Sequence, residues 1–223
     1  RLRVLNLDGN SIGLEGIRPL AALLAHCTRL EELQLGRTSL GDEGAVILSL
    51  CLASLPHLRV LNLDGNSIGF EGIRSLAALL AHCTRLEELQ LSCTSLGDEG
   101  SVALSQCLTS LPNLRVLNLD GNSIGADGVR SLAAVLQQCQ GLKELHLSGA
   151  TLRSTGKDRM ILLSALKYFE DWEVLDQFRK TESRTLKADD NVIAALDVVA
   201  SVVETHSLDL SDMKLTEVAM ISL

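Results

Sequence analysis

Residues 2–13, LRVLNLDGNSIG, decide the fold of this chain, because the same stretch returns unchanged twice more. It recurs from Leu58 and from Leu114, and a variant of it, LEELQLGRTSLG, begins at Leu30. Internal repetition at a fixed period of about 20 to 50 residues is the signature of a repeat architecture. Six units of 28 residues follow one another, opening at Leu2, Leu30, Leu58, Leu86, Leu114 and Leu142.

Each unit predicts one short strand followed by one helix. The front of the unit alternates apolar and polar residues, which is typical of a half-buried strand. The back, EGIRSLAALLAHC at residues 71–83, has helical spacing and good helix formers. A single strand and helix cannot bury their apolar faces alone, so neighbouring units must stack. Because strands pack ~4.8 Å apart and helices ~8–10 Å apart, we expect a curved α/β solenoid with parallel strands on the concave wall.

Two positions in every unit indicate how the units pack. A glycine recurs at one offset, and we attribute it to a backbone turn or to a close approach of helix to strand that a Cβ would obstruct. Asn or Thr alternates just after the strand, where its side chain is expected to bond the turn backbone inside the stack. The glycines are Gly16, Gly44, Gly72, Gly100, Gly128 and Gly156, and the polar residues are Asn10, Thr38, Asn66, Thr94 and Asn122.

The pattern LxxLxLxxN/T-x-L, with a fixed-offset glycine and a 28-residue period, resembles the ribonuclease-inhibitor type of leucine-rich repeat. The resemblance covers residues 1–169 and implies a right-handed solenoid. The same repeats form the C-terminal arm of NOD-like receptors and the body of Ran GTPase-activating proteins. By this resemblance, the chain is expected to be the arm of a NOD-like receptor or of a related cytoplasmic scaffold, which implies a role in innate immune signal transduction.

The regular pattern ends after Phe169 and resumes near Thr205, where leucines again match the strand positions. We therefore divide the chain into six regular repeats at 1–169, an irregular and longer repeat at 170–204, and a truncated repeat at 205–223, about eight in all. Residues 170–223 hold 5 Lys and Arg against 12 Asp and Glu, whereas residues 1–169 hold 15 against 16. Both ends fall inside a repeat, so we interpret the chain as a fragment of a longer array.

Composition and motifs argue against several classes of function. The 223 residues carry a net charge of −8, and only 2% of them are aromatic. This acidic balance disfavours nucleic-acid binding, and no apolar run is long enough to span a membrane. The chain lacks G-x-x-x-x-G-K-[ST], H-E-x-x-H and C-x-x-C, and the calcium-loop resemblance of LDGNSIG fails because Pro19 stands where a glutamate ligand is required. We expect no cofactor, no metal and no enzymatic activity.

The six cysteines follow the repeat, which predicts reduced thiols. Copies of one offset lie two repeats apart, beyond the reach of a disulfide. We therefore expect small buried side chains in a reducing compartment, with Cys93 as the one cysteine that has no copy. The copied cysteines are Cys27, Cys83 and Cys139 at one offset and Cys51 and Cys107 at another.

The strand positions predict a wall of amides and carboxylates that faces the concave space. A solvated strand face must be polar, and this alone explains the wall. A regular acidic ladder also suits a basic protein partner, because charge complementarity speeds and orients association. The candidate binding residues on this wall are Glu32, Gln34, Asp64, Glu88, Gln90, Asp120, Glu144 and His146.

Aromatic residues gather in one short segment of this aromatic-poor chain. Tyr168, Trp172 and Phe178 lie within eleven residues of one another. They either fill the irregular unit or anchor a partner, since Trp and Tyr serve both roles.

We predict a non-enzymatic platform for protein–protein recognition, with no nucleic acid or membrane as partner. Two alternatives stay open. The first is a GTPase activator resembling the Ran-activating proteins, which would present Arg37 or Arg153 to a bound nucleotide. The second is a stand-alone inhibitor of a basic enzyme, resembling ribonuclease inhibitor itself. The sequence defines neither the partner nor the oligomeric state.

Overall fold

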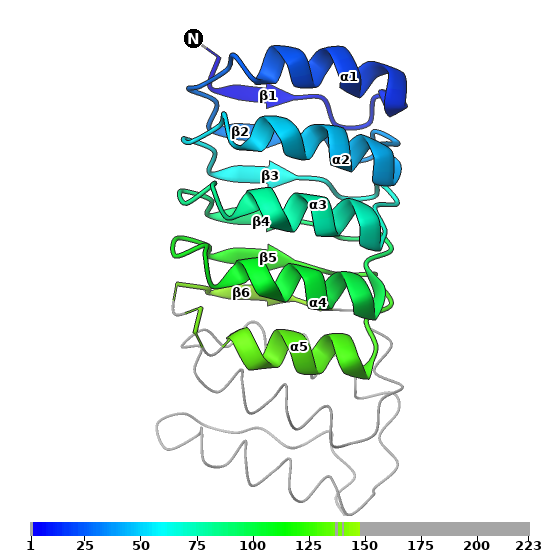
Figure 1. Ribbon diagram of the computed structural model, residues 1–223, viewed down its shortest axis with the longest axis vertical. Helices are drawn as coiled ribbons and strands as arrows, with labels where there is room; N and C mark the ends of the chain where they lie inside the picture. The colour runs from blue at the N-terminus through cyan, green and yellow to red at the C-terminus, as the bar shows by residue number, and fades with distance from the viewer. Residues whose placement is uncertain (1, 137, 140, 148–223) are drawn as a thin grey trace, which may run out of the picture.

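The computed structural model describes residues 2–136, 138–139 and 141–147, in which six short strands alternate with five helices (Figure 1). The strands are β1 (Val4–Asn6), β2 (Glu32–Gln34), β3 (Val60–Asn62), β4 (Glu88–Gln90), β5 (Val116–Asn118) and β6 (Glu144–His146). The helices are α1 (Gly13–Leu24), α2 (Gly41–Leu52), α3 (Phe70–Leu80), α4 (Gly97–Leu108) and α5 (Ala126–Leu136). The predicted units at 170–204 and 205–223 lie outside the described residues.

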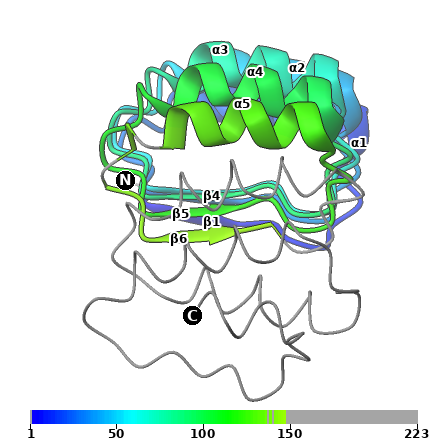
Figure 2. The same ribbon diagram turned by 90° about the horizontal axis from the view of Figure 1, so that it is seen from below.

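The strands form one parallel sheet whose order follows the chain from β1 to β6. Each strand pairs with the next in a register of one repeat, so that Leu5 lies beside Leu33 and Leu33 beside Leu61. Figure 2 shows that the five helices lie together on one side of this sheet. The structure therefore confirms the predicted alternation of parallel strands and helices, and it stacks equivalent positions of successive repeats.

The core lies between the sheet and the helices and is aliphatic. The central residue of each inner strand is fully buried, as is the leucine two residues later. Each such side chain stabilises the fold by roughly 1.5–3 kcal/mol through burial alone. In the inner repeats these strand leucines are Leu33, Leu35, Leu61, Leu63, Leu89, Leu91, Leu117 and Leu119.

The thiols lie much as the sequence predicted. All six cysteines are free. Cys51, Cys83 and Cys107 are buried, Cys93 is exposed, and the other two are half-buried. Burial raises the pKa of Cys51 and of Cys83 to about 11, and that of Cys107 to about 12. The buried thiols are therefore protonated and unreactive near neutral pH.

The fixed-offset glycines lie in the first turns of the helices, and here our prediction of a helix-to-strand contact was wrong. A Cβ on Gly72 would lie 2.5 Å from Cγ2 of Ile68 and 3.0 Å from Cβ of Ala45 in the preceding helix. A Cβ on Gly128 would meet Ile124 and the preceding helix in the same way. The glycine is required because the first turn of the helix packs against the loop that precedes it and, in α3 and α5, also against the preceding helix. Gly156 lies outside the described residues.

Candidate functional site

The side of the sheet opposite the helices, which we name the strand face, is the candidate site. No helix covers it within the part of the chain that the structure describes (Figure 2). Because side chains alternate along a strand, the first and third residues of each strand share this face. The valine–glutamate column comprises Val4, Glu32, Val60, Glu88, Val116 and Glu144, and the amide column comprises Asn6, Gln34, Asn62, Gln90, Asn118 and His146.

Carboxylates in the valine–glutamate column recur on every second strand. Glu32 and Glu88 are half-buried, and among the described residues neither side chain has an ion pair or hydrogen bond. Strands ~4.8 Å apart place these two side chains ~9.6 Å apart, with half-buried Val60 between them. Glu144 lies 3.6 Å from His146, measured from Oε2 to Nε2.

The amide column divides by strand type. In the strands that carry valine, the asparagine is used locally: Asn62 Oδ1 accepts a hydrogen bond from the N–H of Asp64 at 2.9 Å. Asn118 does the same toward Asp120 at 3.0 Å. In the strands that carry glutamate, Gln34 and Gln90 are half-buried, and no such bond is made by either amide in the described repeats. Uncommitted carboxylates and uncommitted amides therefore lie on the same two strands, β2 and β4.

The predicted aspartates lie just beyond the strands and tie repeats together. Asp64 Oδ1 accepts a hydrogen bond from the backbone N–H of Ser92 at 2.6 Å. Asp8 Oδ1 accepts one from the N–H of Gly36 at the same distance. Asp120 occupies the equivalent position one copy later. Asp64 thus has a structural role that the sequence analysis did not assign to it.

Behind the aspartates, the asparagine network that the sequence predicted is confirmed. Asn66 Nδ2 donates hydrogen bonds to the carbonyls of Leu35 at 2.6 Å and Leu63 at 2.9 Å. Its Oδ1 accepts bonds from the N–H groups of Thr38 at 3.0 Å and Leu40 at 3.2 Å. Asn122 repeats these four bonds one copy further along. One buried amide therefore holds the loops of two adjacent repeats.

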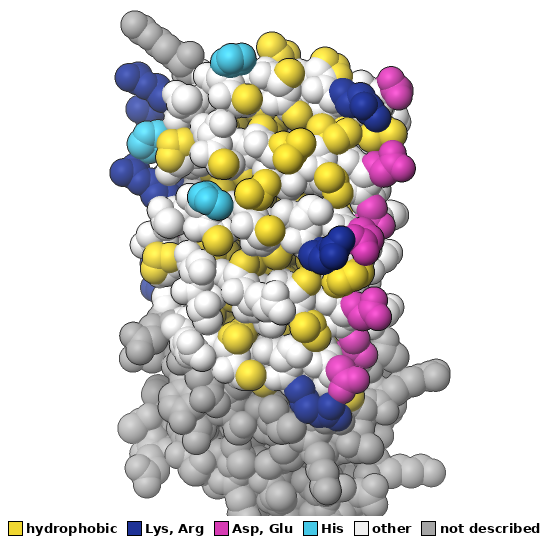
Figure 3. All heavy atoms as spheres, in the orientation of Figure 1, with side chains coloured by type: hydrophobic (Ala, Val, Ile, Leu, Met, Phe, Trp, Pro, Cys, Tyr) yellow, Lys and Arg dark blue, Asp and Glu magenta, His cyan; other side chains and the backbone are white. Residues whose placement is uncertain are grey.

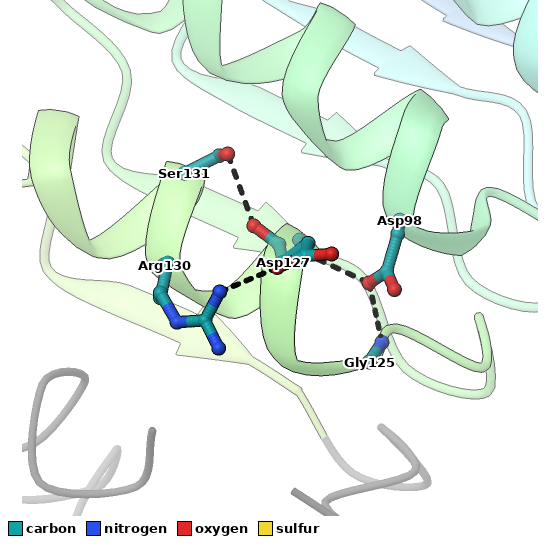
Figure 4. Close-up of polar contacts among 6 residues, drawn as sticks. Asp98, Gly125, Asp127, Arg130 and Ser131 are labelled. Atoms are coloured by element: carbon teal, nitrogen blue, oxygen red, sulfur yellow. Dashed lines mark hydrogen bonds and ion pairs between the residues drawn. The ribbon is translucent and has the colours of Figure 1, made fainter. Parts of the chain in front are cut away.

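The starts of α3 and α5 are capped by an aspartate of the preceding repeat, a feature that sequence reasoning missed. None of α1–α4 has a hydrogen bond from the side chain of its own N-cap residue. Instead, Asp98 Oδ1 accepts bonds from the N–H groups of Gly125 at 2.7 Å and Gly128 at 2.9 Å, at the start of α5 (Figure 4). Asp42 Oδ1 accepts one from Gly72 at 2.8 Å. The sequence pattern that could have indicated these caps is an aspartate in the first turn of one helix, followed in the next unit by two glycines three residues apart.

The start of α5 also carries local polar contacts. Asp127 forms an ion pair with Arg130 on the next turn (Figure 4). Ser131 Oγ donates a hydrogen bond to the Asp127 carbonyl at 3.0 Å. Both contacts lie on the exposed side of the helix and take no part in the strand face.

Five stretches of the chain match the family model described as "Leucine Rich repeat", at residues 2–21, 26–49, 54–77, 82–105 and 110–133. The chain belongs to the leucine-rich repeat family. Comparison with curated proteins found no match. Among solved structures, the chain is similar to "Leiomodin-1 Actin-Binding Site 2 (ABS2)", with a TM-score of 0.50 and 19% identity over 71% of this chain and 94% of that one. At this identity the likeness shows the fold alone.

The charged side chains of this leucine-rich repeat array outside the strand face are largely explained by the fold. The first turn of every described helix carries an acidic residue, which complements the positive end of the helix dipole (Figure 3). Before the strands, Arg59 Nε and Nη2 donate to Glu87 at 2.9 and 2.8 Å. These hydrogen bonds lower the pKa of the Glu87 carboxyl below its ordinary value. Glu32 and Glu88 on the strand face differ, because no arginine donates a hydrogen bond to either carboxylate in the described repeats.

Arg37, on which the GTPase-activator alternative depends, lies in the loop after β2 of the leucine-rich repeat stack. Its φ is 54°, in the left-handed region, at an offset that glycine holds in the neighbouring repeats. The side chain lies against Gly65, where a Cβ would be 3.0 Å from Arg37 Cγ. Cys93 takes the same conformation against Gly121. Arg153 and the aromatic candidates Tyr168, Trp172 and Phe178 lie outside the described residues.

Metal sites and membrane spans are two further features that the leucine-rich repeats could hold. Among the described residues, no group of three or more His, Cys, Asp or Glu is placed to hold a metal ion. None of the helices α1–α5 has the length and apolar character that a bilayer crossing requires.

Proposed function

We propose that this leucine-rich repeat chain is a non-enzymatic platform that binds a protein partner on its strand face. One observation carries the proposal: Glu32 and Glu88 are half-buried carboxylates that make no hydrogen bond or ion pair in the described repeats, on a face that no described helix covers (Figure 2). Many other acidic side chains of the described repeats pair with an arginine, accept a hydrogen bond from a neighbouring loop, or lie at helix starts. Polar groups left free on a regular scaffold favour recognition as the function of this face.

The partner in this proposal presents basic groups. Two unit charges 4 Å apart attract by about 1 kcal/mol in water but by about 4 kcal/mol at the lower effective dielectric near a protein surface. Because Glu32 and Glu88 are half-buried, their attraction to a basic group lies closer to the larger of these two energies. Complementary charge gives such a complex its orientation and a raised association rate, while apolar contact with the valines supplies further burial.

We place the chain in the ribonuclease-inhibitor type of repeat and in the cytoplasmic arm of a NOD-like receptor. The 28-residue period and helices of 11 to 12 residues in each described repeat support the repeat type. The receptor is tested by sequencing the full-length transcript. An upstream G-x-x-x-x-G-K-[ST] module supports the receptor arm, whereas a start codon and a polar cap within a few repeats support a stand-alone inhibitor of a basic enzyme.

Binding of polylysine to the purified chain tests whether the strand face recognises basic partners. We compare the wild-type chain with a triple variant of the strand face, Glu32→Gln, Glu88→Gln and Glu144→Gln. The matched control is Glu15→Gln, Glu43→Gln and Glu99→Gln, which removes the same charge from exposed first-turn positions of three helices. Affinity is measured at low salt and at ~0.15 M salt, where screening acts beyond ~8 Å. We expect a loss confined to the strand-face variant; equal losses in both triple variants would refute the proposal.

A further inference from the structure

We propose that the strand face binds a polyproline II segment that carries Lys or Arg at every third position. The inference rests on the proposed function of this face and adds the shape and the charge spacing of the partner. It depends on two independent observations, namely the distance at which the uncommitted carboxylates recur and the uncommitted amides beside them.

The distance between carboxylates matches the pitch of one peptide conformation. Glu32 and Glu88 lie on strands separated by β3, so their side chains recur every ~9.6 Å along the stack. A polyproline II helix has three residues per turn and rises ~3.1 Å per residue, so every third side chain returns to the same side after ~9.3 Å. Glu144, which lies beside His146, continues the same spacing: from Glu32 to Glu144 the stack spans ~19 Å and six peptide residues span ~19 Å, so the mismatch stays below ~1 Å.

Other peptide conformations fit this spacing less well. In an extended strand, residues three apart point to opposite faces, and residues two apart recur only every ~6.6 Å. An α-helix returns to one side after seven residues, a rise of ~10.5 Å, with a drift of ~20° per heptad. Across the three glutamates, a helix accumulates a mismatch of ~2 Å together with this rotation. The polyproline II segment keeps all of its basic side chains over the glutamates.

The amide column supplies the second observation. Gln34 and Gln90 lie two residues beyond Glu32 and Glu88 on the same strands, ~6.6 Å away. Neither amide is committed within the described repeats, unlike Asn62, whose Oδ1 accepts the Asp64 N–H. A polyproline II backbone has no internal hydrogen bonds, so its carbonyls remain available to side-chain donors. An α-helix offers no such groups, because its backbone is already paired.

Val60 provides apolar surface between the Glu32–Gln34 pair and the Glu88–Gln90 pair. It is half-buried on β3, midway between the carboxylates of β2 and β4. The peptide residues between two basic positions lie over this valine, and proline rings there exclude water from both ion pairs. Along the segment, a basic residue therefore lies over Glu32, the prolines lie over Val60, and the next basic residue lies over Glu88.

The test is fluorescence anisotropy with the full chain and two synthetic peptides of identical composition, together with a helical peptide that carries lysine at every seventh position. One peptide repeats the triplet Lys-Pro-Pro, and the other groups all of its lysines at one end. We expect the triplet peptide to bind several-fold more tightly, because only its charges follow the glutamates. Glu88→Gln should weaken it by about two- to fivefold, the range for one ion pair at a partly exposed site. Gln90→Ala should weaken it without changing the salt dependence.

The control variant is Glu99→Gln, which makes the same charge change in the first turn of α4 and should leave affinity for the triplet peptide unchanged. Circular dichroism of each variant confirms that the fold is kept. Equal affinity for the two peptides, both weakened by Glu88→Gln, overturns the spacing inference while the proposed function stands. Tighter binding of a helical peptide with lysine at every seventh position overturns the polyproline II conformation. Absence of binding by either peptide overturns the inference, and the polylysine comparison then decides the proposed function separately. Equal weakening by Glu88→Gln and Glu99→Gln overturns both.

Discussion

Replacement of Asn66 by alanine tests how the stack is held together, because the chain contains its own control. Asn66 is 1% exposed and bonds groups in two repeats. Asn10 holds the same offset in the first described repeat, where it is exposed and its Nδ2 donates to the Leu7 carbonyl at 2.8 Å. The two substitutions remove identical atoms from the same turn, and the sites differ in the cross-repeat bonds and in burial.

The magnitude follows from the groups that Asn66→Ala leaves behind. The N–H groups of Thr38 and Leu40 lose their buried acceptor, and the Leu35 carbonyl loses a donor at 2.6 Å. The Leu35 carbonyl keeps the Thr38 hydroxyl as a donor, so two N–H groups are left unsatisfied; at about 1–3 kcal/mol each, we expect a loss of about 2–6 kcal/mol in the free energy of unfolding. For Asn10→Ala we expect a loss of about 0.5–1.5 kcal/mol, the value of one exposed hydrogen bond.

Urea unfolding followed by circular dichroism measures both losses, with the slope of each transition compared to check that the same surface unfolds. A third variant, Asn66→Thr, introduces the residue that Thr38 and Thr94 supply in alternate repeats. Thr38 Oγ1 donates to the Leu35 carbonyl at 2.7 Å, so threonine should keep the local bond but not the bonds across repeats. We expect its loss to fall between the other two. If Asn66→Ala and Asn10→Ala cost the same, the cross-repeat network contributes nothing and the reasoning is wrong.

Further predictions concern helix capping and the thiols. Asp98→Ala should lower the free energy of unfolding by about 1–3 kcal/mol, because two N–H groups at the start of α5 lose their acceptor, whereas Glu99→Ala should lower it by less than ~1 kcal/mol; chemical unfolding compares them. Cys93, which is exposed, should react with a thiol reagent in the native chain at pH 8, and a buried thiol such as Cys51 should react only on unfolding; a rate for Cys51 equal to that for Cys93 would contradict the burial. Burial raises the pKa of Cys51 to about 11 and of Cys107 to about 12, so stability should be fully present below the ordinary thiol value of 9.0 and decline as the pH rises through this range, as melting temperatures at pH 8 and pH 10.5 would show.

The repeat period alone predicted the elements and their order, because each unit carries its own strand and helix signals. It also predicted the role of Asn66, since a polar residue inside an apolar stack has no partner except backbone. The helix caps were not predictable in this way. Asp98 bonds Gly128, 30 residues further on, and this pairing depends on where stacking places the first turn of the next helix. The contact of Gly72 was misassigned for the same reason.

The side-chain bonds between repeats recur with a period of two repeats, which matches the 56-residue spacing at which the stretch 2–13 returns from Leu58 and from Leu114. Asn66 and Asp42 both tie the second repeat to the third, and Asn122 and Asp98 tie the fourth to the fifth. Helices α2 and α3 pack more closely than α3 and α4, in keeping with this pairing. The joint between the third and fourth repeats instead has the half-buried Asp64 and, at exposed positions, the Arg59–Glu87 pair and the hydrogen bond from Asn113 to the Thr84 carbonyl.

Because the repeats are joined in pairs, binding on the strand face is coupled to the stability of the stack. Each two-repeat unit contributes one glutamate–glutamine pair to the strand face, which we call a station. The first station is Glu32 with Gln34, and the second is Glu88 with Gln90. The spacing between stations therefore crosses the joint that has fewer buried side-chain bonds. A partner that contacts both stations bridges this joint and opposes its opening, so binding energy and stack stability are coupled. Loss of Asn66 weakens the first unit without touching either station, whereas loss of Glu88 removes one station and leaves both units intact. Recognition and stability on this array are thus separable by residue, although both follow from the same duplication.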